Sequence, residues 1–280
     1  MNPSLLEVID NNRLERLDKD RFLGRASSDS WHRVYGGQVL AQCISAADQT
    51  MNTNFVIHSL HGYFLRPGNP TEPLIYEVNR VRDGQSFCTR RITVSQGEKA
   101  IFEATLSYQV PEQGLEHEMA MPEVAGPEGL LSDRTLLEPL LPKEMRESFG
   151  WPIEFRQLEP IDFSNPQPGD PNMQVWFRTA DKIGDDPALH RQLLAYASDS
   201  PILLAALRPH GLSHLNPQLQ MASIDHALWY HSECRVDEWM LYVLDSHRAV
   251  GGRGLVAGRI YQRDGTLVAS SCQEGLVRKR

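Results

Sequence analysis

The chain has 280 residues, which is enough for one large domain or two of ordinary size. Its hydrophobic fraction of 41% and charged fraction of 23% are typical of a globular protein and exclude an intrinsically disordered one. The formal charge of -8, from 28 Lys and Arg against 36 Asp and Glu, argues against nucleic-acid binding.

The N-terminal residues 1–20 lack the basic segment followed by an apolar one that marks a secretory signal peptide. No later stretch approaches the roughly 18 consecutive apolar residues of a membrane span. The cysteines form no Cys-x-x-Cys pair, and the C-terminal Val-Arg-Lys-Arg is not a peroxisomal Ser-Lys-Leu signal. We therefore expect a cytoplasmic protein without a membrane span or a disulfide framework.

The first half of the chain predicts one helix followed by four strands. Gly36 and Gly37 open a segment in which Val39, Cys43 and Ala47 recur at helical spacing. The segments after it alternate apolar and polar residues, as half-buried strands do. The predicted elements are a helix over residues 38–49 and strands over 56–65, 74–81, 86–96 and 100–110.

The second half repeats this order after a segment rich in Glu and Pro. Residues 113–150 show little periodicity, and only short helical stretches such as residues 134–141 are expected there. A helical segment then leads through Pro201 to four strands, and a tight Asp264-Gly265 turn joins the last two. The predicted elements are a helix over residues 190–199 and strands over 221–231, 239–246, 253–262 and 266–277.

The two halves are similar enough to be two copies of one unit, a helix laid against a curved antiparallel sheet. Aligning Gln109 with Gln273, 164 residues later, also pairs Ser59 with Ser223. The fold class is therefore α+β. We expect an N-terminal repeat over residues 1–112, a linker over 113–150 and a C-terminal repeat over 151–280.

Six stretches between residues 34 and 278 carry distinctive sequence: VYGGQVLAQ (34–42), HSLHGYFLRPG (58–68), RDGQSFCTRR (82–91), YASDSPIL (196–203), ASIDHALWYH (222–231) and VASSCQEGLVR (268–278). Together and in this order they resemble the acyl-CoA thioesterase II family over nearly the whole chain. The resemblance implies a double hotdog fold, in which two helix-on-sheet units are fused in one chain.

The resemblance also implies a function and a site. The function is hydrolysis of fatty acyl-CoA thioesters to free fatty acid and CoA, with acyl-CoA as the substrate, no cofactor and no metal, in a homodimer or higher homo-oligomer. The family's catalytic Asp falls on Asp199 and its Gln on Gln273. Its Thr falls on Ser223, which keeps the hydroxyl group and lacks one methyl group. Because Thr is the stiffer side chain, this departure bears on the rate more than on the function.

These three side chains can together activate a water. A carboxylate such as Asp199 can take the proton of the water as a general base, which contributes ~10²–10⁴-fold to the rate. Ser223 and Gln273 would hold the water toward the carbonyl carbon, and backbone N–H groups at a helix N-terminus would meet the oxyanion. The alternative role for Asp199 is to cap the segment that begins at Pro201.

A second motif competes with this site. Asp185 and His190 have the five-residue spacing of the hydratase motif of hotdog enoyl-CoA hydratases, although Pro187 comes one residue early and the usual Asn is missing. These residues favour a loop in which Pro187 opens the helix. Three alternatives remain for the function: a hydratase, a thioesterase of short or branched acyl groups, and a non-catalytic acyl-CoA binder. Histidine pairs elsewhere lack a carboxylate or cysteine at ligand spacing, so no metal site is expected.

We expect one working site per chain. With the 164-residue offset, Ser59 and Gln109 match two of the three groups, but Tyr35 stands opposite Asp199. A Tyr, with an unperturbed pKa of about 10, is a poor base at neutral pH. Residues 35–47 contain no carboxylate, and Asp48 is the only nearby rival.

Overall fold

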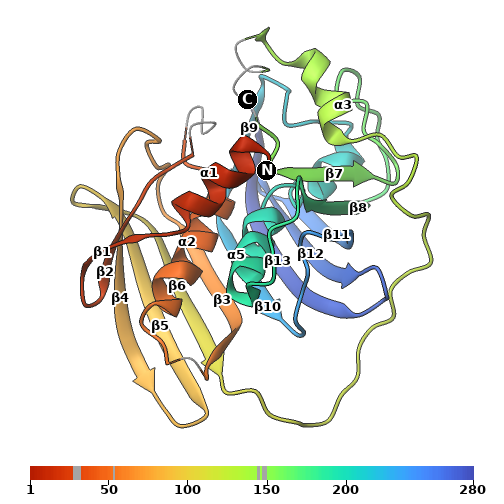
Figure 1. Cartoon of the computed structure of the whole chain (residues 1–280). Helices are drawn as coiled ribbons and strands as arrows, with labels where there is room; N and C mark the ends of the chain where they lie inside the picture. The colour runs from red at the N-terminus through yellow and green to blue at the C-terminus, as the bar shows by residue number, and fades with distance from the viewer. Residues whose placement is uncertain (28–32, 53, 144–145, 147–149) are drawn as a thin grey trace.

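Two helices, α2 (Gly36–Asp48) and α5 (Pro187–Ser198), pack against each other at the centre of the molecule, and a large antiparallel sheet surrounds them (Figure 1). The computed structural model describes residues 1–27, 33–52, 54–143, 146 and 150–280. The start of α2 meets the end of α5, so the two helices run antiparallel. Both predicted helices are therefore confirmed, and each half of the chain contributes one.

The two halves join along β3 (Val56–Phe64) and β10 (Asp225–Tyr230), which pair antiparallel in the middle of a 13-stranded sheet within the described residues. Both predicted meanders are confirmed. From this central pair to each edge of the sheet, the two halves place their corresponding strands in the same order. The first half adds β6 (Lys99–Gln109), β5 (Phe87–Gln96), β4 (Leu74–Asp83), β2 (Arg21–Gly24) and β1 (Glu15–Asp18). The second half adds β13 (Leu267–Lys279) with β9 (Leu219–Ser223), then β12 (Arg253–Gln262), β11 (Met240–Val250), β8 (Asn172–Thr179) and β7 (Ile153–Gln157).

Four outer strands, β1, β2, β7 and β8, and the helix α1 (Pro3–Asn11) were not predicted from the sequence. β8 shows the reason most clearly, because it is covered on both faces. Val175 and Phe177 point into the main core, while Trp176 packs in a smaller cluster on the opposite face. A strand covered on both faces lacks the alternation of apolar and polar residues that identifies a half-buried strand.

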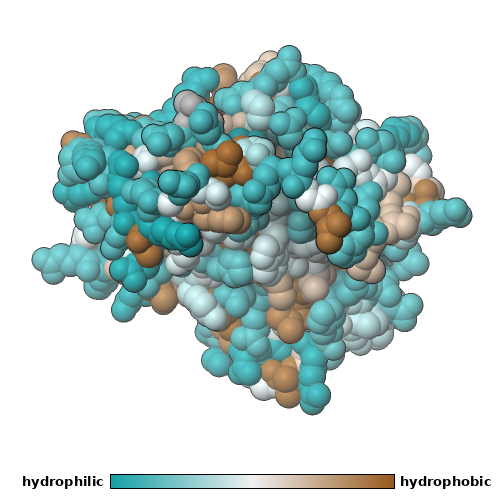
Figure 2. Space-filling view, turned by 90° about the horizontal axis from the view of Figure 1, so that it is seen from below, coloured by the Kyte–Doolittle hydropathy of each residue, from teal (hydrophilic) through white to brown (hydrophobic). Residues whose placement is uncertain are grey.

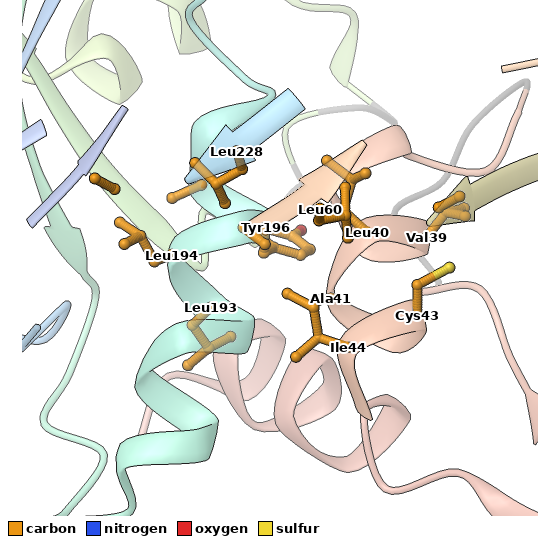
Figure 3. Close-up of a cluster of buried hydrophobic side chains, with 14 of the residues drawn as sticks. Val39, Leu40, Ala41, Cys43, Ile44, Leu60, Leu193, Leu194, Tyr196 and Leu228 are labelled. Atoms are coloured by element: carbon orange, nitrogen blue, oxygen red, sulfur yellow. The ribbon is translucent and has the colours of Figure 1, made fainter. Parts of the chain in front are cut away.

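The main core lies between the sheet and the helix pair. Figure 3 shows Ile44 of α2, Leu193 and Tyr196 of α5, and Leu60 and Leu228 of the central strands in one cluster of buried side chains. Burying one aliphatic side chain of this kind contributes about 1.5–3 kcal/mol. Packing of this kind, more than helix propensity, is what holds short helices such as these in place.

The linker between the two halves runs around the outside of the molecule (Figure 1). The predicted helical stretch forms α3 (Asp133–Leu137) and the 3-10 helix η1 (Glu138–Leu140). The linker packs on the outer face of the second half, where the Ala125 carbonyl accepts a hydrogen bond of 2.8 Å from Trp176 Nε1. It thereby covers the smaller apolar cluster.

Hydrophilic side chains cover most of the face seen in Figure 2, and apolar residues form only small, separate patches on it. Among the helices within the described residues, none is long and apolar enough to cross a membrane.

The predicted pairing of Gln109 with Gln273 is wrong by one residue. On β6 the core-facing side chain is Tyr108, and Gln109 lies on the other face, where its amide donates to Glu112. On β13 the core-facing side chain is Gln273, which is 1% exposed. Because side chains alternate along a strand, a slip of one residue moves a side chain to the opposite face of the sheet. The true counterpart of Gln273 is therefore Tyr108.

The predicted pairing of Ser59 with Ser223 is also wrong. Ser223 lies opposite Gly275, two residues after Gln273, whereas Ser59 lies opposite Ser107, one residue before Tyr108. The register of β3 on β6 shifts between residues 57 and 59, and the corresponding strand of the second half breaks into β9 and β10 at residue 224. An equal spacing in the sequence therefore does not give equivalent positions in the sheet.

Candidate functional site

Asp199 lies where the two central helices meet. It is the C-cap residue of α5, and its Oδ2 atom accepts a hydrogen bond of 3.0 Å from the Gly37 backbone N–H in the first turn of α2. The N-cap residue of α2, Tyr35, makes no capping hydrogen bond with its side chain. Asp199 therefore caps α2, which belongs to the other half of the chain. The alternative role considered from the sequence, a cap for the segment that begins at Pro201, is not the one observed.

The two glycines at the start of α2 make this approach possible. A Cβ atom on Gly36 would lie 2.7 Å from Asp199 Oδ2, and one on Gly37 would collide with the Tyr196 carbonyl oxygen. Only a residue without a side chain lets the first turn of α2 come so close to the end of α5. The N-terminal end of the α2 dipole, which favours negative charge, thus lies beside the carboxylate.

Ser223 and Gln273 complete a chain of hydrogen bonds that ends on this carboxylate. Ser223 is the last residue of β9, and its hydroxyl donates to Asp199 Oδ1 over 3.3 Å. The Gln273 side chain on β13 donates from Nε2 to Ser223 Oγ over 3.0 Å. The structure therefore brings together the three residues that the sequence singled out, from a helix end and two strands.

A fourth residue, His226, joins the same chain and was missed in the sequence. It is fully buried on β10, with Nδ1 in a hydrogen bond with Gln273 Oε1 and Nε2 3.0 Å from Ser198 Oγ. The sequence does contain a signal for its burial. His226, Leu228 and Tyr230 are two residues apart along one strand, so their side chains lie on the same face, toward the core. Burial lowers the pKa of His226, and the nearby Asp199 charge opposes that shift.

Two tyrosines, the half-buried Tyr35 and the fully buried Tyr242, lie near the carboxylate. Tyr35 donates from its hydroxyl to the Tyr196 carbonyl over 2.8 Å, and Tyr242 donates to the Ser198 carbonyl over 3.1 Å. Burial, with the Asp199 charge as a smaller cause, raises the pKa of both phenols. Both phenols therefore stay protonated at neutral pH.

The residues of the hydratase motif lie elsewhere and do not form a site. Asp185 is exposed and ion-paired with Arg235. His190 is buried, with Nε2 donating to the Gly184 carbonyl over 2.9 Å and Nδ1 accepting from the Val236 N–H over 3.2 Å. His190 and Asp199 are nine positions apart along the helix, which corresponds to about 13 Å. Pro187 opens the helix as expected, after Asp186 as its N-cap.

The expected pairing of Tyr35 with Asp199 is wrong, because Tyr35 precedes α2 whereas Asp199 follows α5. The carboxylate at the corresponding end of α2 is Asp48, and it is engaged differently. Asp48 ends α2, accepts a hydrogen bond of 2.8 Å from the Tyr108 hydroxyl and lies 3.4 Å from Gln192 Nε2. The N-terminus of α5 is capped by its own Asp186, which accepts from the Ala188 N–H over 2.9 Å. A phenol thus stands where the second half has the Gln amide, and the helix end needs no carboxylate from the other half.

Replacing Asp48 by Asn is expected to reduce the pH dependence of stability. Burial raises the pKa of Asp48 to about 6, so the folded state binds this proton more tightly than the unfolded state and loses stability as pH rises from about 4 to 6. Because Asp48 is only half-buried in terms of accessible surface, water screens part of this cost, and about 1–3 kcal/mol is expected. Asp48→Asn should therefore be more stable than wild type at pH 8 and equal to it near pH 3.5.

Chemical denaturation at these two pH values measures the difference. Asp170→Asn, at an exposed aspartate, is the matched control and should leave the pH dependence as it is in wild type. An Asp48→Asn variant with the wild-type pH dependence would contradict the prediction.

No group of three or more His, Cys, Asp or Glu side chains that could hold a metal ion occurs in the part of the chain that the structure describes. The site described here consists of a carboxylate, a hydroxyl, an amide and an imidazole at the N-terminus of a helix. Groups of these kinds can transfer a proton to and from a held water or hydroxyl group.

Comparisons with known proteins agree over almost the whole chain. A family model for "Acyl-CoA thioesterase" matches residues 148–276, and one for "Acyl-CoA thioesterase N-terminal domain" matches residues 27–109. Acyl-CoA thioesterase 2 of Haemophilus influenzae is 36% identical over 284 residues, covering 99% of each chain. Human acyl-coenzyme A thioesterase 8 is 37% identical, covering 95% of this chain and 86% of its own.

Solved structures give the same result. The acyl-CoA thioesterase II TesB2 of Mycobacterium marinum is 38% identical and superposes with a TM-score of 0.79, covering 99% of this chain and 98% of its own. A protein of unknown function with a hot dog fold from Alicyclobacillus acidocaldarius has a TM-score of 0.80 at 17% identity, covering 98% of both chains. At that identity the likeness concerns the fold alone.

Proposed function

The chain belongs to the acyl-CoA thioesterase II family, and on this basis we propose that Asp199, Ser223 and Gln273 activate the water that hydrolyses a fatty acyl-CoA. The chain is an acyl-CoA thioester hydrolase with a double hotdog fold. The products are a free fatty acid and CoA. The observation that supports the site is the continuous hydrogen-bond chain from Gln273 through Ser223 to Asp199.

Each of the three side chains has hydrogen-bonding capacity left for the water. Beyond the bonds already described, the Gln273 amide has a second N–H, the Ser223 oxygen has a second lone pair and each Asp199 oxygen has a further lone pair. A water held between them would present its oxygen to the carbonyl carbon of the thioester. As the C–O bond forms, Asp199 takes a proton from the water, and when the C–S bond breaks this proton passes to the departing thiolate.

The N-terminus of α2 supplies the other electrostatic element. Its first backbone N–H groups lie beside Asp199, where the positive end of the helix favours negative charge. An oxyanion that develops on the thioester carbonyl next to the attacking water would meet the same end of the helix. Preorganised donors of this kind contribute about 10²–10³-fold each.

A thiol-release assay with saturated acyl-CoA of increasing chain length tests the proposed function. We expect turnover with fatty acyl-CoA and little turnover with acetyl-CoA, and no water addition to an enoyl-CoA. Release confined to short or branched acyl groups would replace the fatty substrate class, and tight binding without release would make the chain a binder. The family resemblance also supports a homo-oligomer, whose mass light scattering of the purified protein can measure.

Ser223 is expected to act through its hydroxyl. Ser223→Thr keeps the O–H that links Gln273 to Asp199 and should retain the wild-type rate or exceed it, because Thr has the stiffer side chain. Ser223→Ala removes the link, and kcat should fall about 10–100-fold through loss of water positioning. Steady-state kinetics on the three proteins measures this. Equal rates in all three would remove Ser223 from the site.

A further inference from the structure

A buried histidine extends the hydrogen-bond chain of the site beyond Gln273. His226 is 0% exposed and lies between Gln273 on β13 and Ser198 in the last turn of α5. It is not one of the three residues that the family resemblance marks. Asp199 and Asp225 contribute charge to its surroundings, but its two ring nitrogens contact the neutral groups of Gln273 and Ser198.

The direction of each hydrogen bond determines which nitrogen carries the proton. Gln273 donates from Nε2 to Ser223, so its Oε1 atom is the one that faces His226 Nδ1. Oxygen Oε1 can only accept, and Nδ1 must therefore donate. The Ser198 hydroxyl can then donate to Nε2, sharing its proton with the Ala195 carbonyl 2.9 Å away.

We propose that His226 is a positioning residue, whose Nδ1–H holds the Gln273 amide with its N–H groups toward Ser223 and the reacting water. The proposal rests on the proposed function of the site. Without this donor, the Gln273 amide could rotate by a half turn and present its oxygen to Ser223. The Ser223 hydroxyl already donates to Asp199 and has no second proton, so the rotated amide would break the chain and offer the water an acceptor instead of a donor.

Two substitutions separate the two ring nitrogens. His226→Asn places an N–H group near the position of Nδ1, where it can still donate to Gln273 Oε1. His226→Gln places its N–H group near the position of Nε2 and leaves Gln273 without a donor. We expect His226→Asn to keep kcat within about 5-fold of wild type, and His226→Gln to lose ~10²-fold in kcat with KM within about 3-fold, because misplacing a reacting group by about 1 Å can cost that much.

His190 offers a matched control, since it is 2% exposed and also hydrogen-bonded through both ring nitrogens, but only to backbone groups remote from Asp199. His190→Asn and His190→Gln should each keep the wild-type kcat when folded. Thermal melting of all four variants reports folding. If His226→Asn and His226→Gln fold and lose kcat equally, or if KM rises while kcat stays, His226 only fills space and the proposal is overturned.

A measurement on the wild-type protein does not depend on how the variants fold. Nitrogen-15 NMR of the histidine rings distinguishes a proton on Nδ1 from one on Nε2. A buried ring protonated on Nδ1 alone at the assay pH supports the proposal, and protonation on Nε2 alone overturns it. Failure of this proposal leaves Asp199→Asn inactive, whereas failure of the proposed function leaves Asp199→Asn active, so the two are distinguishable.

Discussion

Asp199→Asn is expected to lower kcat by ~10²–10⁴-fold, because the amide cannot take the proton of the attacking water. The substitution should keep the helix cap, although Ser223 loses the oxygen that accepts its hydroxyl proton. Asn is a good helix cap, and its side-chain oxygen can still accept from the Gly37 N–H, so α2 remains capped. Steady-state thiol release gives the loss in kcat, and thermal melting shows whether the fold is kept.

Asp199→Ala separates the capping role of this residue from its chemical role. It removes both the base and the cap, so it should be as inactive as Asp199→Asn and less stable by about 0.5–2 kcal/mol. An Asp199→Asn variant that retains more than about a tenth of the wild-type kcat would show that Asp199 is a structural cap and not the base. Both variants are needed because the Asp199 carboxylate accepts a hydrogen bond from the first turn of α2 and could act as a cap alone.

Gln273→Ala is expected to lose ~10²-fold in kcat, whereas Gln109→Ala should leave hydrolysis nearly intact. Gln273 is buried and holds Ser223, but Gln109 lies on the other face of the sheet and binds Glu112. Removing Gln273 also leaves His226 Nδ1 without its acceptor, which costs about 1–3 kcal/mol of stability, so thermal melting must accompany the kinetics.

The same reasoning predicts one working site per chain. Asp48→Asn should also hydrolyse nearly as fast as wild type, because Tyr108 occupies the position that corresponds to Gln273 and binds the Asp48 carboxylate directly. Calorimetry with a non-hydrolysable acyl-CoA analogue should give one binding site per chain. Two equal sites, or a half-active Gln109→Ala or Asp48→Asn, would show that both halves work.

The sequence by itself determined the elements that have a clear period. Residues 38–49 and 190–199 have apolar side chains at helical spacing, and the six strands of the two meanders alternate or end at glycine turns. It also named Asp199, Ser223 and Gln273, through the resemblance of six short stretches to one family. A strand such as β8, which is covered on both faces, has no such period and was missed.

Only the tertiary structure decided which of these residues face one another. The contact between Asp199 and Gly37 joins residues that are far apart in the chain, and it depends on how closely two glycines let the helices approach. Which face of the sheet Gln109 and Tyr108 occupy depends on the strand register. The register shifts in β3, and the corresponding strand of the second half is interrupted at residue 224, so a constant offset in the sequence cannot predict the equivalent positions. His226 belongs to the site for the same reason. Its alternation places it in the core, but only the pairing of β10 with β13 puts its Nδ1 beside the Gln273 oxygen.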